Sequence, residues 1–448
     1  MQPAATRNVT LPVDPAASEA IYRKVSLRLI PFFCLCYFAA YLDRINVGIA
    51  KLQMLDQLKF SDTVYGLGAG LFFIGYILLE VPSNVILSRV GARIWLGRIM
   101  VTWGLLSAAT MLVQTPTQFY LVRFLLGAAE AGFLPGILYY LTLWYPARRR
   151  GRIFGLFLVG LPLASVLGGP LSGWIMTAFH GVNGWAGWQW LFLLEAVPSV
   201  VLGIALFMVL PNNIRSARWL DDSEKDHLEA ELKKHAEPEQ KHNAMQAFRD
   251  PKILLLGFID MTIAVATYIV SFWLPSMLKE AGAGSAFTIG WLTAIPSVAA
   301  IVLMLVVSAS SDRRKERWGH LTLTLVVTGM ALIATAQSTH SLVLSLVLLT
   351  VANAFAFASF PVFWCLPSLF LSGTAAAAGI ALINSIANLG GFAATFVVGW
   401  IKDATGSQST GLMLFGGLLL VSAIATFLLR GVEQRARSIQ PQPSVQPG

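Results

Sequence analysis

Seven ionisable side chains lie inside long apolar stretches of this 448-residue chain. In the hydrocarbon of a bilayer each such group costs about 2.5 to 3.5 kcal/mol on insertion scales, so each needs a partner or a task. The seven are Asp43, Arg44, Glu80, Arg123, Glu130, Glu195 and Asp260. Arg123 and Glu130 are seven residues apart, which places them on one face of a helix and roughly 10 Å apart along its axis.

Arg44, Asp43 and Glu130 have the side chains with the most specific chemistry. A guanidinium keeps its charge when desolvated and its planar fork of donors matches a carboxylate, so we expect Arg44 to bind a substrate anion. Burial favours a protonated carboxyl group whereas a nearby arginine favours the ionised form, so Asp43 and Glu130 could take up and release a proton. The alternative is that Asp43 and Arg123 form a permanent structural ion pair.

These side chains fall within twelve apolar stretches, each long enough to cross a bilayer with about 20 residues. Hydrophobic residues make up 56% of the chain and charged residues 12%, which excludes an ordinary soluble domain. The expected spans are residues 27–49, 64–87, 94–114, 117–145, 152–178, 188–210, 252–276, 286–309, 319–338, 341–366, 374–401 and 409–430. The sequence therefore predicts an all-α, polytopic membrane protein with twelve transmembrane helices. On these spans Arg44 and Arg123 share a depth in the outer half, and Glu130 lies near the midplane.

Positive charge gathers on one side of these spans. Of the 32 lysines and arginines, only Lys51, Lys59, Lys279 and Lys402 lie in loops on the opposite side. Since the positive side faces the cytoplasm, we expect both termini there, in a multi-pass protein of the cell inner membrane. The same arrangement explains the net charge of +9, so no nucleic-acid partner is expected.

One long polar segment separates two sets of six spans. The expected parts are a cytoplasmic tail (1–26), a six-helix bundle (27–210), a cytoplasmic linker (211–250), a second six-helix bundle (251–430) and a second cytoplasmic tail (431–448). In the linker, Ser223 and Asp226 match the capping box that begins a helix. LGGPLSGWI (167–175) has an echo in LGGFAATFVVGWI (389–401), which indicates two pseudo-symmetric bundles. The glycine pairs of both segments predict close packing between helices.

Four longer motifs carry a family resemblance. They are YLDRINVGIAKLQM (41–54), GYILLEVPSN (75–84), RFLLGAAEAGFLPGILYYLTLWYP (123–146) and GWQWLFLLEAVPSVVLG (187–203). From Tyr22 to Arg430 the chain resembles the anion:cation symporter branch of the major facilitator superfamily, and tartrate and phthalate permeases in particular. The resemblance implies that two six-helix bundles rock around a central site and take up a carboxylate together with protons.

The resemblance also implies which residues form the site. Asn384 and Asn388 form an i,i+4 pair in an otherwise apolar helix, so we expect one of them to face the substrate. The expected substrate-binding residues are Arg44, Tyr41, Tyr76, Trp364, Asn384 and Asn388. The expected proton-coupling residues are Asp43, Glu130 and Arg123. Structural pairing is expected for Glu80 and Glu195, and the role of Asp260 is left open.

The expected function is proton symport of a small organic anion into the cell by a monomer in the lipid bilayer, without a metal or cofactor. The fifth span, GLFLVGLPLASVLGG (155–169), lacks the glutamine that some relatives present to sugar acids. This favours an aromatic carboxylate such as phthalate, or a small dicarboxylate such as tartrate, over an aldonate or glucarate.

Two other function classes are weighed against symport. Gly169, Pro170 and Gly173 partly match a motif of antiporters, so an anion antiporter or exporter is the first alternative. An enzyme would need a nucleophile, metal or cofactor site. The six histidines lie in loops or at span ends, and the three cysteines are scattered without metal-ligand spacing, so no enzyme is expected.

Overall fold

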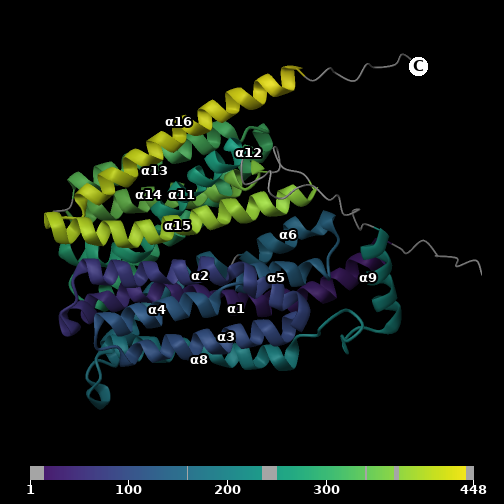
Figure 1. Ribbon diagram of the computed structural model, residues 1–448, viewed down its shortest axis with the longest axis horizontal. Helices are drawn as coiled ribbons and strands as arrows, with labels where there is room; N and C mark the ends of the chain where they lie inside the picture. Colours follow the sequence, from purple (N-terminus) through teal and green to yellow (C-terminus); the bar gives the residue numbers. More distant parts are fainter. Residues whose placement is uncertain (1–14, 159, 235–249, 339–340, 368–372, 440–448) are drawn as a thin grey trace, which may run out of the picture.

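A computed structural model describes residues 15–158, 160–234, 250–338, 341–367 and 373–439, and within these ranges it contains helices and no strand. Figure 1 shows two helical bundles side by side, one from each half of the chain. The start of the first helix, the end of the last helix and the linker helix α9 (Asp222–Lys234) lie together at one end of the molecule. We call this the linker end, and the opposite one the far end.

The first bundle contains eight α-helices because two of its six spans are divided. Its helices are α1 (Pro15–Leu58), α2 (Asp62–Val90), α3 (Ala92–Ala109), α4 (Pro116–Glu130), α5 (Phe133–Thr142), α6 (Ala147–Leu158), α7 (Gly160–Ala178) and α8 (Gly187–Val209). Thr115 caps α4, since its side chain accepts from the Gln118 amide while the Gln118 side chain accepts from the Thr115 amide. Pro116 follows in the first turn, where it costs no hydrogen bond.

In the described part of the second bundle there are six α-helices. They are α11 (Pro251–Glu280), α12 (Ala286–Arg314), α13 (Trp318–Gln337), α14 (Leu342–Phe363), α15 (Gly373–Thr405) and α16 (Ser409–Ile439). Among the described residues, eleven helical segments are long and apolar enough to cross a membrane. The span expected at 152–178 falls on α6 and α7, whose apolar part Leu163–Ala178 is shorter. The prediction of an all-α, polytopic fold with two six-span bundles is confirmed.

The capping box of the linker helix lies two residues earlier than expected. The Asp221 carboxylate accepts from the Glu224 amide at 2.8 Å, and the Glu224 carboxylate accepts from the Asp221 amide at 3.0 Å. The capping pair is therefore Asp221 and Glu224, and the prediction of Ser223 and Asp226 was wrong. Glu224 also pairs with Lys24 of α1 at 2.7 Å, which ties the linker to the first bundle.

The repeated glycines are surfaces of close helix contact, as predicted. A Cβ added to Gly169 of α7 would meet Thr293 and the backbone of Gly290 on α12. A Cβ added to Gly390 of α15 would come within 2.5 Å of the Met261 carbonyl oxygen on α11. The first contact joins the two bundles, so Gly169 has a packing role that any side chain would disturb.

A network of charged side chains joins the bundles at the far end. This far-end cluster consists of Lys51, Asp56, Asp62, Lys279, Glu280, Lys402 and Asp403. Asp62 at the start of α2 is 2.6 Å from Lys51 and 3.0 Å from Lys402, while Lys279 is 3.1 Å from Asp56. Lys402 and Lys279 belong to the second bundle, whereas Asp62 and Asp56 belong to the first. The far ends of the bundles are therefore held together by ion pairs.

Candidate functional site

The Arg44 side chain occupies the centre of the site between four helices. Its guanidinium forms an ion pair with Glu130, the last residue of α4. It also lies over the rings of Phe72 and Tyr76 on α2, at 5.1 and 5.4 Å, and 3.5 Å from the hydroxyl of Tyr268 on α11. The side chains of Arg44 and Glu130 are 12% and 5% exposed. A charged pair this well buried is available to a ligand that enters the protein interior and to little else.

The depth expected for Arg44 was wrong. The sequence placed Arg44 level with Arg123 and above Glu130, because the first span was taken to end at residue 49. The structure continues α1 to Leu58. Arg44 therefore lies about as far from the far end of its helix as Glu130 does from the start of α4 at Pro116, and the two side chains meet.

Arg123 lies seven residues before Glu130 in α4, nearer the far end, and is completely buried. Its guanidinium lies 5.1 Å from the Phe72 ring centre, so this ring contacts two cations, Arg123 and Arg44. None of its three nitrogens has a hydrogen-bond partner among the described residues. A buried, unpaired guanidinium is costly unless water or an anion reaches it. Arg123 therefore leaves a positive charge next to the Arg44–Glu130 pair.

Asp43 points away from this pair, into the first bundle. Its carboxylate accepts hydrogen bonds from Trp103 at 2.9 Å, Ser107 at 2.9 Å and Ser199 at 2.6 Å, on α3 and α8. An ion pair between Asp43 and Arg123, the alternative expected from the sequence, is not found among the described residues. Three neutral donors hold the carboxylate instead. Asp43 and Glu130 are thus two separate candidate proton sites on either side of α1.

The helix that carries Glu130 breaks directly after it, which the sequence analysis missed. Ala131 leaves the helical region with ψ 129°, and Gly132 has φ +85° before α5 begins at Phe133. Two signals were present, because Gly132 tolerates a positive φ and Pro135 has no amide for the Ala131 carbonyl. The expected span 117–145 is therefore two helices, and Glu130 ends the first.

Glu80 and Asn384 meet across the two bundles. The Asn384 amide of α15 donates to the Glu80 carboxylate of α2 at 3.2 Å. Asn388 donates instead to the Asn384 carbonyl oxygen of its own helix at 3.1 Å. Asn384 is the asparagine that reaches toward the first bundle. Tyr76 lies one helical turn before Glu80, so the contact borders the Arg44 site.

The remaining candidates are spread more widely. Trp364 caps α14 and packs edge-to-face against Phe363, at 5.6 Å between ring centres. No contact between Trp364 and Arg44 is found among the described residues. Asp260 of α11 is buried, and its Oδ1 has no hydrogen-bond partner in the part of the chain that the structure describes. Glu195 accepts from Ser172 at 2.7 Å, which agrees with a structural role.

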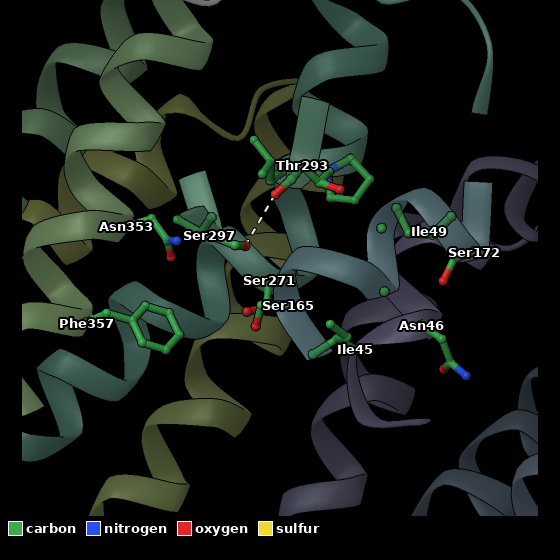
Figure 2. Close-up of a pocket in the computed structure, with 15 residues that line it drawn as sticks. Ile45, Asn46, Ile49, Ser165, Ser172, Ser271, Thr293, Ser297, Asn353 and Phe357 are labelled. Carbon is green, nitrogen blue, oxygen red and sulfur yellow. Dashed lines mark hydrogen bonds between the residues drawn. The ribbon is translucent and has the colours of Figure 1, made fainter. Parts of the chain in front are cut away.

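A cavity that the sequence did not predict lies between the bundles (Figure 2). Its lining residues from α1 are Ile45, Asn46 and Ile49, which follow Arg44 toward the far end. It contains about 520 Å³ of space free of atoms, part of it open to solvent. Its walls come from α1, α7, α11, α12 and α14, and they carry hydroxyl and amide groups. The polar lining residues are Asn46, Ser165, Ser172, Ser271, Thr293, Ser297 and Asn353.

Comparison with known proteins supplies the family. The model of the family described as "Major Facilitator Superfamily" matches residues 33–395. A putative metabolite transport protein, NicT, of Pseudomonas putida is 53% identical over 414 residues, covering 92% of this chain and 95% of that protein. A putative tartrate transporter of Agrobacterium vitis is 45% identical, covering 91% of both chains. A quinolone resistance transporter of Acinetobacter baumannii is 42% identical, covering 93% of this chain and 96% of that protein.

Solved structures agree on the fold. A bacterial homologue of the human lysosomal transporter Spinster has a TM-score of 0.71 at 14% identity, covering 96% of this chain and all of that chain. A D-xylose-proton symporter has a TM-score of 0.68 at 16% identity, covering 90% of this chain and 97% of that chain. The family match and the curated relatives confirm the predicted resemblance to the major facilitator superfamily.

Proposed function

Because this chain belongs to the major facilitator superfamily, we propose that it is a secondary transporter that imports a small organic anion together with protons. It is a membrane transporter and not an enzyme. The observation that carries the proposal is the buried ion pair between Arg44 and Glu130. The name of a relative as a putative tartrate transporter supports a carboxylate as the substrate.

The ion pair suggests how anion and proton are coupled. While Glu130 is ionised it occupies the Arg44 fork, and a substrate carboxylate has to compete with it. A proton on Glu130 weakens that pair and leaves Arg44 free for the substrate. Arg123 supplies a second positive charge nearby, which favours an arriving anion. Substrate and proton then bind together. The proton releases Arg44 from Glu130, and the substrate carboxylate on Arg44 keeps Glu130 from pairing with it again.

The remaining expectations complete the proposal. Tyr41, Tyr76, Trp364, Asn384 and Asn388 would line the substrate path, and Asp43 would be a second proton site. The protein would act as a monomer in the cell inner membrane with both termini in the cytoplasm. The shared location of α9 and the two helical ends in Figure 1 supports termini on one side.

The test is uptake into proteoliposomes that contain the purified full-length protein. Labelled phthalate, benzoate, tartrate and gluconate are offered with an imposed pH gradient, acidic outside. We expect at least one carboxylate to accumulate above its external concentration, and accumulation to stop when a protonophore collapses the gradient. Accumulation that persists without the gradient would contradict proton symport.

Export or exchange is a second candidate because a relative is named a quinolone resistance transporter. Gly169, Pro170 and Gly173 also partly match an antiporter motif. The packing of Gly169 and Gly173 against α12 gives these glycines a structural explanation that does not depend on transport direction. Stimulation of carboxylate uptake by an alkaline exterior, with proton movement opposite to the substrate, would favour this candidate.

A further inference from the structure

The cavity of Figure 2 is lined by residues that neighbour the Arg44 site in the chain. Ile45, the neighbour of Arg44 in α1, lines it, and Ser271 lines it one helical turn beyond Tyr268 of α11. Tyr41 lies close to both Ser271 and Ser165. A ligand whose carboxylate contacts Arg44 could therefore extend its other end into this cavity.

The hydroxyl groups of the cavity wall already donate their protons to the protein. Ser165 donates to the Leu161 carbonyl oxygen at 3.3 Å, and Ser271 donates to the Thr267 carbonyl oxygen at 2.9 Å. Ser297 donates to the carbonyl oxygen of its own helix four residues earlier, at 3.3 Å. Thr293 makes the corresponding bond three residues earlier, at 2.7 Å. Each hydroxyl then has only lone pairs left for a ligand.

Two of the three other donors on the wall are also engaged. The Asn353 amide donates to the Pro296 carbonyl oxygen at 3.1 Å, which leaves its Oδ1 available as an acceptor. Ser172 donates to the Glu195 carboxylate at 2.7 Å, so a buried acid lies behind the wall. Asn46 is the exception, because both of its amide atoms are buried without a hydrogen-bond partner among the described residues.

The balance of groups in the cavity selects against a second negative charge. None of the fifteen lining residues, all of them described, is a lysine or an arginine. A carboxylate placed here would lose its hydration and meet oxygen lone pairs and no cation, with the Asn46 amide as the one donor among the lining residues that has no partner. A hydroxyl or a ring N–H would instead donate to these oxygens without breaking any existing bond.

We propose that this cavity is the specificity subsite for the uncharged end of the substrate, and that the end it accepts carries a hydroxyl or N–H donor. The preferred substrate is then a hydroxylated or N–H-bearing monocarboxylate, with its single carboxylate at Arg44, and not a dicarboxylate. This inference rests on the proposed function, because it takes the Arg44 pair as the anion site.

The ligand class is tested in the unmodified protein by competition, in which unlabelled probes inhibit the uptake of a labelled carboxylate into proteoliposomes. The probes are benzoate, 3-hydroxybenzoate, 4-hydroxybenzoate and phthalate, which share a ring and differ in the group added to it. We expect at least one hydroxybenzoate to inhibit at a lower concentration than benzoate, and phthalate to be the weakest inhibitor. Phthalate stronger than both hydroxybenzoates would overturn the subsite while leaving anion symport intact. If no carboxylate competes, the proposed function fails as well.

Ser271→Ala and Ser297→Ala test the wall directly, because alanine removes one acceptor without adding bulk. Loss of one neutral hydrogen bond should weaken the hydroxybenzoate about threefold to tenfold and leave benzoate unchanged. Ser338→Ala is the matched control, since Ser338 bonds the Ala334 carbonyl oxygen at 2.9 Å outside the cavity. Equal changes for benzoate and hydroxybenzoate in both cavity variants would show a merely structural role and overturn the proposal.

Discussion

The contacts of Arg44 make the shape of its side chain matter as much as its charge. The guanidinium pairs with Glu130 while it lies over two aromatic rings, and a lysine ammonium offers neither the fork nor the flat face. A substrate carboxylate that replaces Glu130 would use the same fork. A two-point contact with the substrate therefore requires an arginine at this position.

We predict that Arg44→Lys remains inserted and folded but raises the KM for substrate at least tenfold, because the charge survives and the bidentate contact is lost. Uptake into proteoliposomes and the melting temperature of the purified protein measure the two properties. Arg215→Lys is the matched control, since Arg215 makes a two-point contact with Glu229 at 2.8 Å in the linker. Near-normal KM in Arg44→Lys would remove Arg44 from the site.

We predict that Glu130→Gln separates exchange from accumulation. The amide imitates the protonated acid, so the carrier should still exchange substrate across the membrane. It should fail at uptake driven by a pH gradient, because glutamine cannot release a proton. Counterflow with preloaded vesicles measures the first activity and gradient-driven uptake the second. Loss of both in folded protein would make Glu130 structural or part of the binding site, and survival of both would assign the proton to Asp43 or Asp260.

At the scale of helices, the sequence predicted which spans exist but not where each helix ends. Long apolar runs have to be helical in a bilayer, because no water is there to satisfy the backbone, so nearly every span was found. The end of α1 was misplaced because Lys51 and Asp56 read as a loop, whereas ion pairs with other helices keep them helical. The contact between Arg44 and Glu130 depends on the extra length of α1. The local sequence pattern does not reveal this length.

The break between α4 and α5 is the other element that sequence periodicity concealed. Apolar residues continue through Gly132, so composition gave no sign of the interruption. Only the pairing of a glycine with a proline three residues later marks it. The same break ends α4 at Glu130, so the backbone leaves the helix directly after the ion pair.

We predict that Gly132→Ala destabilises the protein more than Gly181→Ala does, and lowers transport. Both glycines have nearly the same positive φ, +85° and +83°, so both variants lose about 1 to 2 kcal/mol to backbone strain. A Cβ at Gly132 would also lie 2.5 Å from the Ser83 hydroxyl oxygen, whereas Gly181 has open space. Thermal unfolding in detergent compares the two. Equal melting temperatures would show that the Ser83 contact gives way freely.

At the scale of the whole molecule, ion pairs join the two bundles at the far end. Lys51 is the most confined member of the far-end cluster, 4% exposed and 3.6 Å from the Trp273 ring centre. Asp62 compensates it while also binding Lys402 of the other bundle. One carboxylate therefore neutralises a buried cation and closes the gap between the bundles. The charge pattern placed Lys51, Lys59, Lys279 and Lys402 on the same side of the spans. It could not show that three of these lysines form ion pairs.

We predict that Asp62→Asn weakens this closure and opens the cavity toward the far end more often. The amide cannot balance two lysines, so Lys51 and Lys402 would repel each other where they now share a partner. A cysteine at Ser297 in a cysteine-free background reports the change as faster labelling by an impermeant maleimide added outside. Asp222→Asn is the control, because Asp222 pairs with Lys225 at 3.0 Å on the exposed linker helix and takes no part in joining the bundles. We expect labelling to accelerate at least threefold in Asp62→Asn alone. Unchanged or slower labelling would mean that the close helix contacts, such as that of Gly169, keep this end shut without help from charge.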